Sequence, residues 1–226
     1  MSRLVILVEG DSELSFMQRQ IIPALYSRCV GNWSIEPCKI ISNVKLHKKG
    51  GNISYDYLFN DVSRFSAQKC TVITTFLDFF RLPSNFPGFT SNGCVVDVVE
   101  EEMKSDLEAR ISNLPLFIPY IQKYEFEALL FSNMDGFNYL LDDDEQLSLI
   151  KNIIDEFPTP EDINGGQATA PSKRLLSIFN YNKVADSADM LEIIGLDAIY
   201  SRCPRFSKWF DKLADIVAQS DRLTAF

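Results

Sequence analysis

Short runs of residues typical of buried strands recur through the first half of the chain. Residues 4–8 (LVILV) form a continuous apolar run rich in β-branched residues, which is typical of a strand buried on both faces in a parallel sheet. Weaker runs at 33–41, 70–76 and 116–121 predict three further strands, and the third strand ends near Asp78. The pattern therefore indicates a sheet of at least four strands.

Segments with apolar residues at helical spacing lie between these runs. One opens at Glu13, with Asp11 or Ser12 as its expected cap, and others cover 55–65 and 97–111. Strands that alternate with helices predict a parallel sheet with helices on both faces. We therefore expect an α/β fold of the Rossmann-like kind.

The chain becomes mostly helical after Glu125. Helices are predicted at 125–131, 134–141, 145–157, 173–179, 190–194 and 204–219. The acidic run at 142–145 is interpreted as a helix start, and the apolar stripe of the last helix as core rather than a base-stacking surface. We expect an α/β core over 1–132 and a mostly helical cap over 133–226, packed on that core.

Acidic side chains follow several of the predicted strands. Glu9 comes directly after the first strand, Asp78 ends the third, and Glu125 and Glu127 follow the fourth. Ligands of open α/β sheets bind beyond the carboxyl ends of the strands, and Mg²⁺ takes carboxylate ligands there. Glu13 lies one helical turn after Glu9 and completes the set. The sequence thus predicts a site for Mg²⁺ or Mn²⁺, with Glu9, Asp78 and Glu13 as catalytic candidates.

Glu13 and the pair of Glu125 and Glu127 also have plainer interpretations. Glu13 stands in a first helical turn, where a carboxylate also complements the helix dipole. Glu125 and Glu127 are two residues apart, so only one of them is expected to face the site, and Glu125 is favoured. Asp78 follows an apolar run and precedes two phenylalanines, a setting that solvation does not explain.

Candidate phosphate-binding cations occur in two places. Lys48 and Lys49 belong to a basic loop with two glycines, which is equally well explained as a solvated loop. Lys173 and Arg174 follow a proline at a predicted helix start, where free N–H groups also attract anions. His47 is the single histidine, which leaves little material for histidine-based catalysis.

Composition narrows the class of protein. The 226 residues are 46% hydrophobic, and the formal net charge of −9 excludes a generally basic nucleic-acid coat, so contact with nucleic acid has to be local. No apolar run approaches the roughly 20 residues that cross a bilayer. The five cysteines are widely spaced and odd in number, which argues against a disulfide framework and against a zinc site. We expect a cytoplasmic protein without membrane association.

Several segments resemble one family. Residues 8–13 (VEGDSE) are similar to the first motif of the Toprim domains in OLD-type nucleases. With this motif, five more segments resemble a bacterial Toprim-like family that is often encoded beside ABC-type or AAA ATPases in antiviral defence loci. They are 48–51 (KKGG), 74–83 (TTFLDFFRLP), 120–131 (YIQKYEFEALLF), 164–166 (NGG) and 170–174 (APSKR).

The resemblance implies a Toprim-like fold and a function. Glu9 matches the Toprim glutamate that binds metal or moves a proton, and Asp78 matches the first aspartate of the D-x-D pair. Phe80 stands in place of the second aspartate, so Glu125 or Glu127 has to supply the missing ligand for a two-metal arrangement. The implied activity is Mg²⁺-dependent cleavage of DNA or RNA by the effector of a defence system, held in check by an ATPase partner, in a possible homo-oligomer. The alternative is a non-catalytic interaction or sensor subunit of an ATPase complex.

Overall fold

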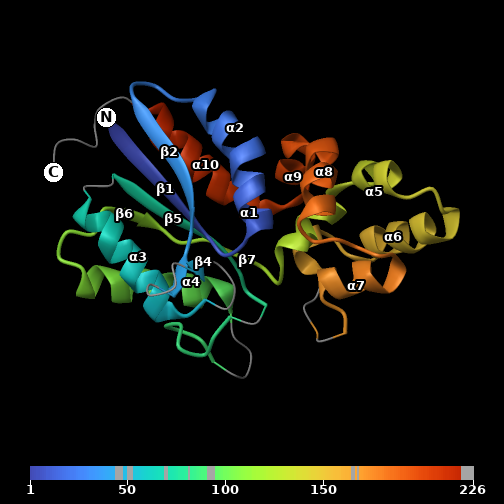
Figure 1. Cartoon of the computed structure of the whole chain (residues 1–226), viewed down its shortest axis with the longest axis horizontal. Coiled ribbons are helices and arrows are strands. Elements are labelled where there is room, and N and C mark those ends of the chain that lie inside the picture. The colour runs from blue at the N-terminus through green and yellow to red at the C-terminus, as the bar shows by residue number, and fades with distance from the viewer. Residues whose placement is uncertain are drawn as a thin grey trace.

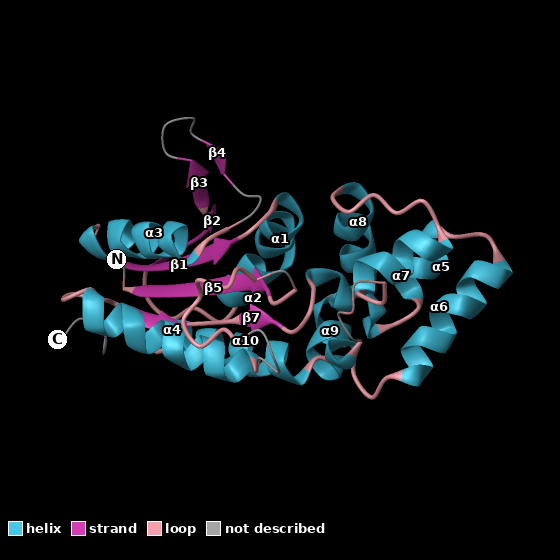
Figure 2. Cartoon of the chain, turned by 90° about the horizontal axis from the view of Figure 1, so that it is seen from below, coloured by secondary structure: helices cyan, strands magenta, loops and turns pink. Residues whose placement is uncertain are grey.

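The computed structural model describes residues 1–43, 48–49, 53–68, 71–80, 82–90, 95–163, 166 and 168–219. They form a twisted sheet covered by helices on both faces and, beside it, a lobe of helices (Figures 1 and 2). The predicted α/β class with a mostly parallel sheet and a helical C-terminal part is confirmed.

The main sheet has five strands, all paired in parallel. They are β1 (Ser2–Val8), β2 (Trp33–Lys39), β5 (Val72–Asp78), β6 (Leu116–Ile118) and β7 (Ile121–Gln122). The order is β2-β1-β5-β6, and β7 also pairs with β5. A separate antiparallel pair joins β3 (Ile41–Asn43) to β4 (Lys48–Lys49). The chain moves outward from β1 to β2 and then returns to the other side of β1 as β5. The order of the strands therefore reverses between β1 and β5, which is the position where open α/β sheets bind ligands.

The predicted strand at 116–121 is interrupted. Leu116–Ile118 pairs with the first half of β5 and Ile121–Gln122 with its end, and Pro119 and Tyr120 lie between them. Two threonines of β5 bridge this break. Thr74 Oγ1 donates to the Ile118 carbonyl at 2.6 Å, and Thr75 Oγ1 exchanges hydrogen bonds of 2.9 Å with the backbone of Tyr120. The hydroxyls thus replace the missing ladder bonds of a buried strand.

Apolar residues cover both faces of the sheet, and its central strands β1 and β5 are buried on both sides. The side chains of Leu4, Ile6 and Val8 pack on one face, and those of Val5 and Leu7 pack on the other. The first face is covered by α1 (Asp11–Phe16), the π-helical turn η1 (Met17–Ile21), α2 (Ile22–Tyr26) and α10 (Pro204–Ala218). The second is covered by α3 (Tyr55–Ala67) and α4 (Val96–Arg110).

The helical lobe lies beyond the carboxyl ends of the strands, as Figure 2 shows. It contains the 3₁₀ segments η2 (Phe126–Ser132) and η3 (Pro160–Asp162) and the helices α5 (Asp135–Leu140), α6 (Asp144–Glu156), α7 (Pro171–Ile178), α8 (Ala185–Ile194) and α9 (Leu196–Arg202). Asp143 caps α6, as the acidic run predicted. Several details differ from prediction. Gly10, rather than Asp11 or Ser12, precedes α1 at the N-cap position, η2 is a 3₁₀ helix, and η3 and α9 were not predicted.

The last helix returns from the lobe to the sheet. Trp209 of α10 donates from Nε1 to Thr74 Oγ1 at 2.8 Å and stacks on Tyr120. The buried Glu161 carboxylate accepts the backbone N–H groups of Arg205 and Phe206 at 2.8 and 3.0 Å, and so fixes the start of this helix. Among the described residues, no helix combines the length and apolar character that a membrane crossing needs.

Candidate functional site

A cavity of about 520 Å³ opens at the carboxyl ends of β1 and β5, where the strand order reverses. Side chains from the sheet, from the loops that follow it and from the helical lobe surround this cavity. Its lining residues are Glu9, Ile53, Asp78, Phe80, Leu82, Pro83, Glu125 and Lys183. Two carboxylates that the sequence placed at separate strand ends, Glu9 and Asp78, therefore lie in one cavity. Their charges interact, because the negative charge of Glu9 contributes to raising the pKa of Asp78.

The turn after β1 places two glutamates. Glu9 follows the last residue of β1, and Glu13 lies in the first turn of α1 with its side chain only 2% exposed. Gly10 makes this arrangement possible, since a β-carbon at this position would lie 2.6 Å from Glu13 Oε2. Glu13 is thus buried against its own turn, which is unlike a solvated first-turn acid. Its Oε2 atom is buried and has no hydrogen-bond partner among the described residues.

Asp78 ends β5 and is held by the segment that begins η2. Its Oδ1 atom accepts the Phe126 backbone N–H at 2.8 Å, and its side chain is 12% exposed. The chain turns toward Asp78 at Tyr124, whose φ of 67° lies in the left-handed region that non-glycine residues seldom adopt. The Tyr124 carbonyl also accepts the Phe80 N–H at 2.6 Å. A strained backbone is thus held in place beside the carboxylates.

Glu125 and Glu127 have different surroundings. Glu125 lines the cavity, and its two carboxylate oxygens accept the Ser172 N–H at 2.8 Å and the Ser172 hydroxyl at 3.0 Å. The start of α7 therefore binds the Glu125 carboxylate through Ser172. Glu127 is fully buried beside Lys183, and its Oε1 atom makes no hydrogen bond. Glu125 therefore lines the cavity, while Glu127 joins Glu13 and Asp78 around a common cation.

Lys183 is the cation at the centre of this group. Its Nζ atom lies 3.2 Å from Glu127 Oε1, 3.7 Å from Glu13 Oε1 and 3.9 Å from Asp78 Oδ2. Lys183 stands in the loop before α8, so the helical lobe supplies this charge. Its carbonyl accepts the Ser12 hydroxyl at 3.1 Å and the Ser187 hydroxyl, which ties the loop to α1 and to α8.

The proton affinities reflect the crowding of acids. Burial raises the pKa of Glu9 to about 7, and the negative charge of Glu13 adds to the effect. Burial also raises the pKa of Asp78 well above its usual range and raises the pKa of Glu127, although Lys183 lowers both. For Lys183, partial burial lowers the pKa, but the nearby carboxylates outweigh it and raise the pKa above its usual value. Strongly raised pKa values of several groups inside one cavity are typical of functional sites.

Two of the predicted phosphate-binding residues, Lys173 and Arg174, do not join this group. Arg174 turns toward α6, where Nε donates to the Thr169 carbonyl at 2.9 Å and the guanidinium stacks over Phe157. Lys173 is half-buried and is not among the described residues that line the cavity. The side chains of Lys48 and Lys49, and all of His47, lie outside the described part of the chain.

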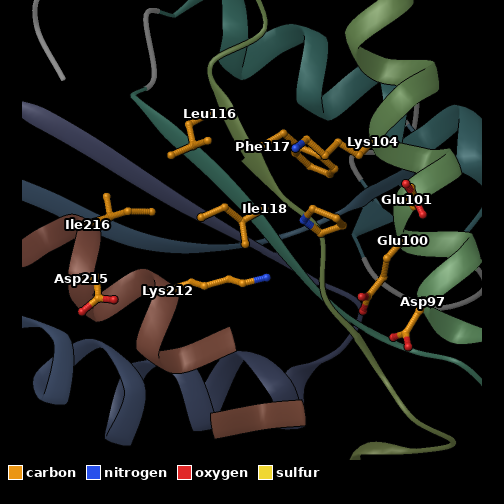
Figure 3. A pocket seen from close by; sticks show the side chains of 11 residues that line it. Asp97, Glu100, Glu101, Lys104, Leu116, Phe117, Ile118, Lys212, Asp215 and Ile216 are labelled. Carbon is orange, nitrogen blue, oxygen red and sulfur yellow. The ribbon is translucent and has the colours of Figure 1, made fainter. Parts of the chain in front are cut away.

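A second cavity of about 550 Å³ lies beside the edge strand β6, between α4 and α10 (Figure 3). Some of its charged groups pair with neighbouring residues. Glu100 accepts the Ile121 N–H at 2.6 Å and pairs with Arg205 at 2.9 Å, while Lys104 lies 3.6 Å from Glu108. We therefore place the candidate site at the carboxylate cavity, where three largely buried acids share one lysine and Glu13 Oε2 has no hydrogen-bond partner among the described residues.

Sequence reasoning missed Lys183 and Ser172 as parts of this site. Lys183 lies in a polar loop between two predicted helices, and no spacing or motif marks it. The one available signal was the charge balance, because several buried carboxylates require a nearby cation. That signal does not tell which lysine of the chain supplies the charge.

Comparison with family models matches residues 8–214 to one family, described as "Domain of unknown function (DUF4276)". Neither the curated proteins nor the solved structures gave a match. The matched range runs from the end of β1 into α10 and so includes every residue of the carboxylate cavity. The chain belongs to the DUF4276 family.

Proposed function

We propose that this protein is a metal-dependent nuclease that hydrolyses phosphodiester bonds in DNA or RNA with Mg²⁺ or Mn²⁺. The observation that carries the proposal is the meeting of Glu9, Glu13, Asp78 and Glu127 with Lys183 at the reversal point of the sheet. A fold gains nothing from crowding acids in a buried position, since their repulsion and desolvation both oppose folding. A functional role explains why the cluster is present.

The carboxylates fit a divalent cation in their chemistry. Hard divalent ions take oxygen ligands, and Glu13 Oε2 and Glu127 Oε1 are buried oxygens without hydrogen-bond partners. As they stand, no group of three or more His, Cys, Asp or Glu side chains in the described part of the chain is arranged to hold a metal ion. The cluster is arranged instead around the Lys183 ammonium. Glu13, Asp78 and Glu127 would hold the ion, with Glu9 at the cavity wall.

The chain's own residues supply the remaining chemistry. A bound divalent ion would polarise the phosphoryl group and stabilise the charge that develops on its oxygens. Glu9, with a pKa of about 7, accepts a proton from the attacking water near neutral pH. Lys183 lines the cavity with its side chain 47% exposed, so its ammonium is available to a substrate phosphate. It takes the role that the sequence gave to Lys173 and Arg174.

The wider setting is proposed from the resemblance to OLD-type Toprim nucleases. An ATPase partner of the ABC or AAA type would restrain the cleavage, and the system would act in antiviral defence. The net charge of −9 supports a substrate contact that is confined to the cavity.

The test is cleavage of labelled single- and double-stranded DNA and RNA with Mg²⁺, with Mn²⁺ and with EDTA. Glu9→Gln and Asp78→Asn are expected to lower metal-dependent cleavage by roughly 10²-fold or more, because each removes a charged group at the reacting atoms. Glu145→Gln and Asp142→Asn change exposed acids of the helical lobe and serve as matched controls. Equal cleavage by all four variants, or no metal-dependent cleavage of any substrate, contradicts the proposal.

A second candidate is a non-catalytic subunit that uses this core as a docking or sensing surface. Two observations favour it: Phe80 lines the cavity where the resemblance places a second aspartate, and Lys183 already neutralises part of the cluster. Titration with Mn²⁺ separates the two candidates. A docking subunit needs no ion, and it binds none that depends on Asp78.

A further inference from the structure

The position of the Lys183 ammonium conflicts with that of a metal ion. Nζ lies 3.2–3.9 Å from oxygens of Glu127, Glu13 and Asp78. An ion that binds the same oxygens sits about 2.0–2.1 Å from each of them if it is Mg²⁺. The two cations would then be nearly in contact inside a region of low dielectric, where like charges repel strongly.

Lys183 is built so that its side chain can leave. The carboxylates are 0–12% exposed, whereas the lysine side chain is 47% exposed and lines the open cavity. The backbone at this position is fixed, because the Lys183 carbonyl accepts hydroxyl hydrogen bonds from Ser12 and Ser187. Rotation about the side-chain bonds therefore moves the ammonium without unfolding the loop.

We propose that Lys183 is a built-in competitor of the divalent ion, so that the ammonium and the metal are alternative occupants of the cluster of Glu13, Asp78 and Glu127. Metal entry drives the ammonium to the mouth of the cavity, where it meets the phosphate of the substrate. This inference rests on the proposed metal-dependent function. It adds that Lys183 controls when the carboxylates can bind the metal ion. Without metal, the lysine balances the charge and is withheld from the substrate.

The first test is calorimetric titration of Mn²⁺ into the full chain, as wild type, Lys183→Met and Lys151→Met. Lys151 is an exposed lysine paired with Asp155 on α6, so its variant controls for the loss of one positive charge. Removing a competing charge at this distance is expected to tighten Mn²⁺ binding by roughly tenfold or more. The control variant is expected to bind as the wild type does. Equal or weaker binding by Lys183→Met overturns the inference.

The second test uses the wild type alone, since Lys183→Met leaves buried acids without their partner and can fail to fold. Acetic anhydride modifies unprotonated lysines, and peptide mass spectrometry reports the rate at each site. With saturating Mn²⁺, acetylation of Lys183 is expected to rise severalfold while that of Lys151 stays constant, because an amine displaced to the mouth of the cavity is more accessible to the reagent than one held against the buried carboxylates.

The outcomes separate the two proposals. If the wild type binds Mn²⁺ but Lys183 reactivity stays constant or falls, the metal site stands and the competition is refuted. If neither the wild type nor Lys183→Met binds Mn²⁺, the metal-dependent function fails and the competition fails with it.

Discussion

Glu9 is predicted to make the protein less stable as the pH rises. Burial and the charge of Glu13 raise the pKa of Glu9 to about 7 in the folded protein, against an ordinary value of 4.5. The folded state therefore holds this proton more tightly than the unfolded chain does. The stabilising contribution is fully present below pH 4.5, and it is lost as the pH rises from 4.5 through 7.

The magnitude follows from the two pKa values. At about 1.4 kcal/mol per pH unit, the full loss is roughly 3 kcal/mol, and roughly 2–3 kcal/mol of it falls between pH 5 and pH 8. Glu9→Gln carries no titrating group at this position. Its free energy of unfolding, relative to wild type, is therefore expected to rise by that amount over the same interval.

The assay is urea unfolding of both proteins at pH 5 and pH 8 in EDTA, with Glu145→Gln as the control. Glu145 is exposed at the start of α6, so its variant is expected to follow the wild type at both pH values. A stability difference between Glu9→Gln and wild type that is the same at pH 5 and pH 8 would show that Glu9 ionises normally. The reasoning about a strained acidic site would then be wrong.

Three further substitutions test the site and its support. Gly10→Ala places a β-carbon 2.6 Å from Glu13 Oε2 and is expected to weaken Mn²⁺ binding by roughly tenfold or more. The far-UV circular dichroism spectrum is expected to stay unchanged. If calorimetry shows unaltered affinity, Glu13 is not part of the metal site. Glu161→Ala removes the buried carboxylate that accepts two backbone N–H groups at the start of α10. Urea unfolding is expected to show that the free energy of unfolding falls by about 2 kcal/mol. A fall of less than about 0.5 kcal/mol contradicts this role of Glu161. Trp209→Phe removes the 2.8 Å hydrogen bond to Thr74 Oγ1 and is expected to cost about 1–2 kcal/mol in the same measurement, so an unchanged midpoint refutes the role of that bond.

The order of strands and helices could be predicted because local patterns encode it. The run at 4–8 has the composition of a strand buried on both faces, and it became β1 at the centre of the sheet. A parallel sheet brings the carboxyl ends of its strands to one edge, so the proximity of Glu9 and Asp78 followed from the fold class. The position of a side chain can be predicted from sequence when it depends only on the strand or helix that carries it, as it does for Glu9 and Asp78 at the ends of β1 and β5.

The choice between Glu125 and Glu127 could not be made in this way. The choice depends on the left-handed backbone at Tyr124 and on the 3₁₀ segment that follows it. A single left-handed residue leaves no pattern in the sequence, and over seven residues a 3₁₀ helix and an α-helix have similar patterns of apolar positions. Lys183 is a stronger example. The loop before α8 brings it to the cluster, and the packing of α8 against α1 and η2 sets the position of that loop.

The most direct test of a carboxylate-held divalent ion is a crystal structure of the wild type soaked in Mn²⁺, with anomalous diffraction data. The account predicts an anomalous peak among the carboxylates of Glu13, Asp78 and Glu127, with the Lys183 ammonium displaced into the cavity. A structure at saturating Mn²⁺ that shows no peak there, with Nζ still bound to Glu127, contradicts it.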